Sequence, residues 1–176
     1  MIVTLSPITG EEADHLLRLS DQHMASLYPA ESNHLVSSES LREGDATFIG
    51  AFLAGDAMSS PPSVAAVDDG GTEHATRCIG CVAAKFYRDE GYAEIKRLFV
   101  AEAHRGGGLA RQLMAAVECE IIAQGIQCAR LEMGIYQPEA DALYRSLGYR
   151  DIPPFGDYSL DPLSQFLEKR PLVSRA

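Results

Sequence analysis

An arginine and three glycines stand where an expected strand gives way to an expected helix. Arg105 and the glycines at 106–108 follow strand-like residues 94–100 and precede a helical pattern that continues to Gln124. Glycine lets the backbone approach a ligand closely, and a helix N terminus presents unpaired N–H groups and the positive end of its dipole. Arg105 adds a cation with a planar fork of donors. The segment therefore predicts a seat for a pyrophosphate.

Two common nucleotide motifs fit this segment less well. A P-loop requires Gly-x-x-x-x-Gly-Lys-Ser/Thr, but Leu109 and Ala110 follow Gly108, which excludes that motif. A dinucleotide fingerprint requires Gly-x-Gly-x-x-Gly; Gly106 and Gly108 fit, whereas Arg111 replaces the third glycine. The strand–turn–helix context is nevertheless right for a dinucleotide, so a nicotinamide oxidoreductase stays open as an alternative.

The run from Val100 to Ala110 resembles the acyl-CoA signature of the GNAT superfamily of N-acyltransferases, Arg/Gln-x-x-Gly-x-Gly/Ala. The run from Ala140 to Tyr149 is similar to the family's Ala-x-x-Leu-Tyr-x-x-x-Gly-Phe/Tyr segment, at the expected distance. Residues 134–140 look closest to a small-molecule bacterial branch. Gln137 departs from the asparagine that contacts CoA in many members, although the longer amide can still donate and accept.

The resemblance covers nearly the whole chain and implies a fold and an activity. The fold class is α/β (α+β), a GNAT fold with a mixed, twisted central β-sheet flanked by helices on both faces, in a single domain over residues 1–176. The activity is an acetyl-CoA-dependent N-acetyltransferase that moves an acetyl group to a primary amine of a small molecule by direct attack in a ternary complex. A non-catalytic CoA-binding or regulatory module of the same fold, and a protein or peptide N-acetyltransferase, remain as alternatives.

The resemblance also assigns roles to individual residues. Tyr144 matches the acid that protonates the departing CoA sulfur; its alternative is a core aromatic. Glu94 matches a general base, acting directly or through a water, which an alkyl amine with a pKa of about 10 requires. Its alternative is a strand glutamate that caps a hairpin or pairs with Lys96 or Arg97. A backbone N–H at the end of strand 94–100 would polarise the carbonyl, beside strands that splay apart.

The cofactor and acceptor residues follow from the same matching. The residues expected to hold acetyl-CoA are Leu98, Phe99, Val100, Arg105, Gly106, Gly107, Gly108, Leu109, Ala110, Gln137 and Ala140. The acceptor is expected to meet Arg97, His23, Tyr28 and Tyr158, with His34, Phe155 and Asp157 on the same elements. Arg97 is suited to a substrate carboxylate, and no metal is expected.

Apolar spacing and breaker residues predict the elements that must position these groups. Strands are expected at residues 2–5, 47–53, 77–87, 92–100, 127–135 and near 165–168. Helices are expected from a Thr9–Glu12 capping box to Pro29, at 38–42, at 107–124 and from Pro138 to Gly148. Residues 54–75 are expected to form a long flexible loop.

Composition limits the partners and the location. The formal charge of −10 disfavours a broad grip on nucleic acid. No apolar run approaches the roughly 18 residues of a membrane span, and the first residues lack a signal peptide, so a cytoplasmic location is expected. The expected partners are a small-molecule amine and a second copy of the chain.

The cysteine spacing is a weaker signal. Cys78 and Cys81 form a Cys-x-x-Cys within an expected strand. Because residues three apart on a regular strand face opposite sides, their sulfurs are expected to diverge, which favours reduced, structural cysteines.

Overall fold

The computed structural model describes residues 3–9, 11–29, 44–53 and 78–173. The expected loop at 54–75, the expected short helix at 38–42 and His34 lie outside these residues.

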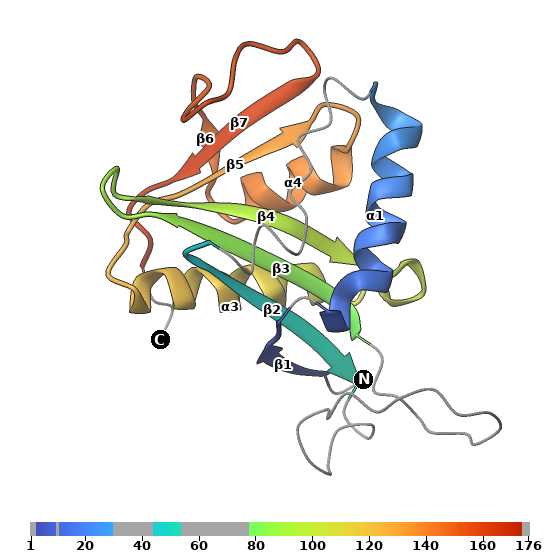
Figure 1. The fold of residues 1–176 in the computed structure, drawn as a ribbon. Coiled ribbons are helices and arrows are strands. Elements are labelled where there is room, and N and C mark those ends of the chain that lie inside the picture. Colours follow the sequence, from blue (N-terminus) through green and yellow to red (C-terminus); the bar gives the residue numbers. More distant parts are fainter. Residues whose placement is uncertain (1–2, 10, 30–43, 54–77, 174–176) are drawn as a thin grey trace, which may run out of the picture.

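Seven strands form one mixed sheet in the order β1-β2-β3-β4-β5-β7-β6 (Figure 1). They are β1 (Val3–Pro7), β2 (Ala46–Leu53), β3 (Cys78–Tyr87), β4 (Tyr92–Val100), β5 (Ala129–Gly134), β6 (Arg150–Asp151) and β7 (Ser164–Lys169). All neighbouring strands are antiparallel except β4 and β5, which are parallel. The sequence predicted each of these strands except β6, because two residues are too short to show a periodicity.

The helix α3 (Leu109–Ala123) covers one face of the sheet, and α4 (Pro138–Ser146) lies on the same side near β5. The predicted apolar stripe of α3 is confirmed: Leu113, Val117 and Ile121 are fully buried against β2, β3 and β4. Pro138 is at the start of α4, as its fixed backbone angle φ favours.

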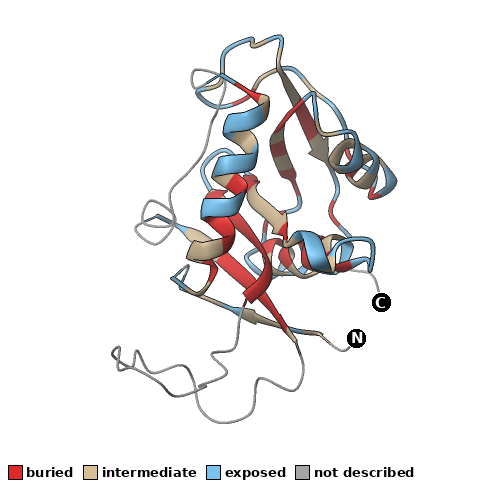
Figure 2. Cartoon of the chain, turned by 90° about the vertical axis from the view of Figure 1, so that its right-hand side faces the viewer, coloured by how far each residue is buried: buried red, intermediate tan, exposed pale blue. Residues whose placement is uncertain are grey.

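The helix α1 (Asp14–Leu27) covers the opposite face and turns its exposed side outward (Figure 2). The Glu12 carboxylate accepts hydrogen bonds from the Thr9 N–H and hydroxyl at 3.2 and 3.0 Å. Glu12 belongs to a 3₁₀ turn, η1 (Glu11–Ala13), so the pair lies before α1 rather than at its first turn. Leu16 and Leu17 form the buried face of α1, whereas Leu19 is 45% exposed.

The expectation that Cys78 and Cys81 diverge is wrong. Both thiols are buried in the cluster beneath α1, and all four cysteines of the chain are free. The cause is a β-bulge: Ala51 pairs with Gly80 while Phe52 pairs with Cys78, so one residue of β3 is extra. The extra residue breaks the alternation, which places two side chains three positions apart on one face.

Within the described residues, no helix combines the length and apolar character that a membrane crossing requires. The location expected from the sequence stays a prediction.

Candidate active site

Strands β4 and β5 diverge in the middle of the sheet. They pair only at Ala93–Ala129 and Glu94–Arg130, and no further pairing joins them as β4 continues to Val100 and β5 to Gly134. In Figure 1 the two strands begin together and their arrowheads lie apart, with α4 beside the fork. The edges of β4 and β5 that face each other thus present backbone groups without a ladder partner there. This is the splay that the resemblance to the GNAT superfamily implied, and it offers those groups to a ligand.

An irregularity in β4 sets which side chains face the acceptor side of the fork. Between the pairs Cys81–Phe99 and Ala83–Lys96, β4 has one residue more than β3, and Arg97 has a positive φ of 58°. A bulge of this kind turns consecutive side chains to one face. Lys96 accordingly reaches Glu94 and Arg97 reaches α1, both on the face opposite α3.

The glycine turn lies where the sequence placed it, between β4 and α3. Gly106 and Gly108 have φ near +80°, which glycine adopts without strain. Gly108 is the N-cap of α3, no side chain caps that terminus, and a Cβ on any of the three glycines would meet no atom within 4 Å. The turn is therefore open, with the positive end of a 15-residue helix behind it.

Arg105 is anchored to the end of β4. Its Nε donates to the carbonyl oxygen of Val100 at 3.0 Å, and its guanidinium lies 5.4 Å from the centroid of the Phe99 ring. The residue is exposed. An anchored, exposed guanidinium beside a helix N terminus suits an anionic ligand. Of the other residues expected to hold acetyl-CoA, Gln137 is the N-cap of α4 and Ala140 packs on the core in its first turn.

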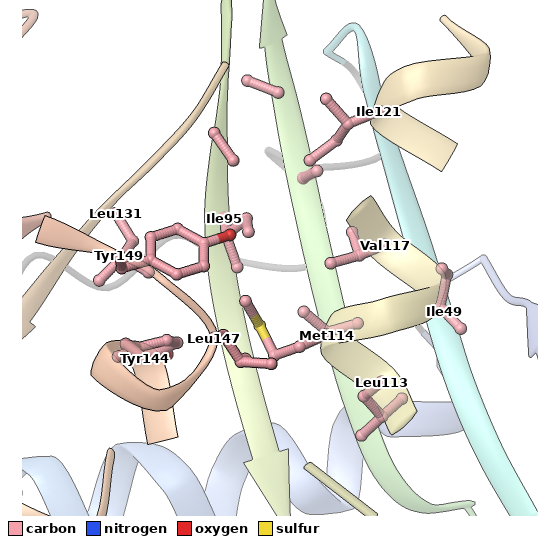
Figure 3. Close-up of a cluster of buried hydrophobic side chains, with 14 of the residues drawn as sticks. Ile49, Ile95, Leu113, Met114, Val117, Ile121, Leu131, Tyr144, Leu147 and Tyr149 are labelled. Carbon is pink, nitrogen blue, oxygen red and sulfur yellow. The ribbon is translucent and has the colours of Figure 1, made fainter. Parts of the chain in front are cut away.

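Tyr144 is the most buried residue of α4, at 7% exposure. Its ring meets the ring of Tyr149 edge-on, with centroids 5.7 Å apart, in the cluster that contains Leu147 (Figure 3). Burial, and then the charge of Glu132, raise the pKa of the Tyr144 phenol well above its usual value. The Tyr144 phenol therefore holds its proton at neutral pH.

A buried chain of contacts fixes Tyr149 and thereby Tyr144. The Tyr149 hydroxyl donates to Glu118 Oε1 at 3.0 Å, and Lys169 Nζ donates to Glu118 Oε2 at 2.5 Å. The Tyr149 N–H also donates to the Tyr144 carbonyl oxygen at 3.1 Å. The sequence did not reveal Glu118 as part of the core, since a lone glutamate within a helix is normally solvated.

Glu94 lies on the other side of the sheet at 2% exposure. Its Oε1 accepts a hydrogen bond from the Tyr158 hydroxyl at 2.6 Å and lies 2.9 Å from Lys96 Nζ, and its Oε2 accepts from the Tyr87 hydroxyl at 3.3 Å. Lys96 Nζ also donates to the Tyr158 oxygen at 2.7 Å. The ion pair with Lys96, which the sequence left open as an alternative for Glu94, is thus present. Such a pair does not exclude a role in proton transfer.

The four expected acceptor residues do not share one place. Tyr158 joins the Glu94 cluster, whereas His23 is exposed on α1. Arg97 donates to Asp21 of α1, and its side chain is only 6% exposed. Tyr28 is 5% exposed, and its hydroxyl accepts the Tyr136 N–H at 2.8 Å, which ties the end of α1 to the end of β5. These contacts make Arg97 and Tyr28 links between elements, and their role toward an acceptor stays a prediction.

Two residues near the fork were missed by sequence reasoning. Lys96 appeared only as a partner for Glu94, and Glu132 of β5 did not appear at all. Glu132 accepts a hydrogen bond from the Ser164 hydroxyl at 2.7 Å, and its charge raises the pKa of both Tyr144 and Tyr158. Glu132 lies on β5 two residues after Arg130, the last residue of β5 that pairs with β4, and this places it at the fork. Alternation with Leu131 and Met133, which enter the α3-side core, was the available signal.

Across the ranges that the structure describes, no three His, Cys, Asp or Glu residues gather in a way that could hold a metal ion.

Comparisons with known proteins agree on one family. A family model described as an acetyltransferase (GNAT) domain matches residues 64–151. The IAA acetyltransferase of Azospirillum brasilense is 37% identical over 154 residues, which cover 88% of this chain and 87% of that protein. The uncharacterized N-acetyltransferase YsnE of Bacillus subtilis is 28% identical over 173 residues, covering 97% of this chain and 99% of the relative.

A comparison with solved structures finds acetyltransferases of the same fold. The crystal structure of the PaiA N-acetyltransferase from Thermoplasma acidophilum in complex with coenzyme A superposes with a TM-score of 0.67 at 17% identity, over 96% of this chain and 99% of that one. At 17% identity the match shows a shared fold and nothing about function.

Proposed function

This chain belongs to the GNAT family of acetyltransferases, for which acetyl-CoA is the acyl donor, and from that premise we propose that its acceptor is a primary amine of a small molecule, such as an amino acid or a related amine. One observation carries the proposal. The fork between β4 and β5 has an open glycine turn at its end, a buried phenol on one face and a buried carboxylate cluster on the other. A donor and an acceptor can therefore approach the same opening from opposite faces.

The residues of the donor side would bind and orient the thioester. The glycine turn and Arg105 would hold the pyrophosphate through backbone N–H groups and the guanidinium. The inner edge of β4, at Leu98, Phe99 and Val100, would pair with the pantetheine amides, and a backbone N–H there would stabilise the oxyanion. Tyr144 would give its proton to the departing sulfur.

On the acceptor side, a base must remove the proton of the amine, because an alkyl ammonium has no lone pair for attack. Glu94 is the carboxylate of this face that lies beside the point where β4 and β5 separate. Tyr158, Lys96 and the carboxylates of Glu94 and Glu132 gather there and favour a compact polar acceptor. The likeness of residues 134–140 to the small-molecule branch supports the same class.

Turnover tests the proposal. Thiol release from acetyl-CoA would be measured with a panel of amino acids, polyamines and peptides. We expect one class of small amine to stimulate release, with Tyr144→Phe and Glu94→Gln each lowering kcat by about 10²-fold or more. Release with peptides alone would assign the peptide alternative, and CoA binding without release would assign a non-catalytic module.

Calorimetry tests the donor site separately. Arg105→Ala should weaken CoA binding by about 10- to 100-fold, the value of a charge-assisted hydrogen bond of about 1.5–3 kcal/mol. Arg88→Ala is a matched control, because Arg88 is exposed at the β3–β4 turn and pairs with Asp45. Equal CoA affinity in both variants would contradict the placement of the pyrophosphate.

A further inference from the structure

The carboxylate of Glu94 is enclosed by the hydroxyls of two tyrosines. Tyr158 donates to one oxygen at 2.6 Å and Tyr87 to the other at 3.3 Å, and Glu94 itself is 2% exposed. An acceptor amine therefore cannot reach the carboxylate directly while these contacts are in place. A proton that arrives at Glu94 comes through one of the groups that touch it, which are the two hydroxyls and the ammonium of Lys96.

The two tyrosines lie on different sides of Glu94 along β4. Tyr87 is the last residue of β3, at the β3–β4 hairpin. It pairs there with Tyr92, and the two rings stack with their centroids 4.8 Å apart. Tyr158 comes from the loop between β6 and β7, and its oxygen accepts from Lys96, which lies beyond Glu94 toward the fork. Glu132 at the fork also acts electrostatically on Tyr158. Tyr158 is thus the neighbour of Glu94 on the side of the fork.

The Tyr158 hydroxyl is fixed and already aligned for transfer. Its ring packs against Phe155 and Phe166, with centroids 5.3 and 5.4 Å away. The hydroxyl donates a hydrogen bond to Glu94 and accepts a hydrogen bond from the ammonium of Lys96. That ammonium also lies 2.9 Å from Glu94 Oε1. Burial, and then the charge of Glu94, raise the pKa of this phenol far above its usual value, so the hydroxyl keeps its proton at rest.

We propose that Tyr158 is a catalytic proton relay between the acceptor amine and Glu94, an assignment that rests on the proposed function. One proton of the acceptor ammonium moves to the Tyr158 oxygen while the Tyr158 proton moves to Glu94 Oε1. The neutral nitrogen that results bonds to the carbonyl carbon of the thioester and gives its second proton to water. The carbon–sulfur bond breaks, its electron pair leaves on sulfur, and sulfur takes the proton of Tyr144. Glu94 ends protonated, Tyr144 ends as phenolate, Tyr158 is unchanged, and exchange with water restores both.

Lys96 has a positioning role in this relay. Its ammonium touches the Tyr158 oxygen and would stabilise the negative charge that builds there during the double transfer. The relay is thus a cation-supported path from a half-buried phenol to a buried carboxylate.

The relay is tested by a matched pair of variants, Tyr158→Phe and Tyr87→Phe, each of which removes one hydroxyl from Glu94. With the best amine of the panel at saturation, we expect Tyr158→Phe to lower kcat by about 10²- to 10³-fold with the Kd of acetyl-CoA unchanged, and Tyr87→Phe to stay within about threefold of the wild type. The double variant of Tyr158→Phe with Glu94→Gln should be no slower than the slower single variant, because the two groups act as one unit.

Two further readouts separate a relay from a structural contact. The rate in mixtures of H₂O and D₂O should curve with isotope content in the wild type, as for two protons in flight, and become linear in Tyr158→Phe. Fluorotyrosine at position 158 keeps the hydrogen bonds and makes the phenol more acidic, so kcat should change with the number of fluorines.

An unchanged kcat in Tyr158→Phe, a loss confined to KM, or no response to fluorination would overturn the relay. A wild-type protein that releases no thiol with any amine would instead overturn the proposed function, before any variant is compared.

Discussion

The contact between Tyr28 and Gly134 gives the sharpest stability prediction. A Cβ added at Gly134 would lie 2.2 Å from Tyr28 Cζ, 2.3 Å from its hydroxyl oxygen and 2.7 Å from Cε1. Gly134 has a backbone conformation that other residues adopt, so the glycine is needed for close approach and not for its angles. Gly134→Ala therefore isolates a steric effect between the end of α1 and the end of β5.

The expected loss of stability follows from the contacts that the Tyr28 ring must break or compress. Overpacking a tight contact costs about 1–3 kcal/mol. To move away, the ring must also break the 2.8 Å bond that its oxygen accepts from the Tyr136 N–H, and a buried polar group left unpaired costs about 1–3 kcal/mol. Replacing glycine by alanine within a strand returns about 0.5–1 kcal/mol. We expect a net loss of about 3 kcal/mol in the free energy of unfolding.

Urea unfolding of four proteins measures this value: the wild type, Gly134→Ala, Tyr28→Ala and the double variant. In the Tyr28→Ala background the added methyl group enters empty space, so the cost of Gly134→Ala should fall to about 0.5 kcal/mol or less. Gly107→Ala is the matched control, because its Cβ meets nothing within 4 Å and its φ is not positive. A cost below about 1 kcal/mol for Gly134→Ala, or a cost that persists without Tyr28, would refute the steric explanation.

Three further outcomes are expected. Glu118→Leu should lower the free energy of unfolding by about 3 kcal/mol, because it leaves the ammonium of Lys169 buried without its carboxylate; urea unfolding checks this, and a loss below about 1 kcal/mol would contradict it. Cys119 is the exposed cysteine, so a thiol reagent should modify one thiol quickly in the native protein and four after unfolding; a second fast thiol would contradict the burial. The hydrogen bonds from Arg145 hold the pKa of Asp151 below its usual 3.8 in spite of partial desolvation, so the pair stabilises the fold above that pH and loses its effect as pH falls through the lowered value. The difference in Tm between the wild type and Arg145→Met should accordingly shrink below about pH 4, and a difference independent of pH would exclude the ion pair as its cause.

The order and boundaries of the long elements were predictable from local signals. The stripe of Leu113, Val117 and Ile121, the proline that opens α4 and the glycine turn before α3 all act within a few residues of themselves. Spacing and backbone preference are local properties of the chain, so they can be recognised without knowing which residues pack against the element. The match to a family came from the same local segments.

Pairing irregularities were not predictable. The bulges at Ile79 in β3 and at Arg97 in β4 turn Cys81 to the side of Cys78 and Arg97 to the side of Lys96, against the regular alternation. A bulge depends on the register between two strands, and the register is set by contacts across the whole sheet.

The sequence by itself indicated the groups that we assign to the donor: the glycine turn, Arg105 and Tyr144 can be found from spacing because each belongs to one local motif. Only the tertiary structure showed the cluster that we assign to the acceptor side. It brought Tyr158 from a loop against Glu94 and Lys96 of β4, and it tied the Tyr28 hydroxyl to the backbone just after β5. The physical reason is the distance along the chain: contacts between residues 64 positions apart leave no periodic trace in sequence, whereas a helix start and its glycines do.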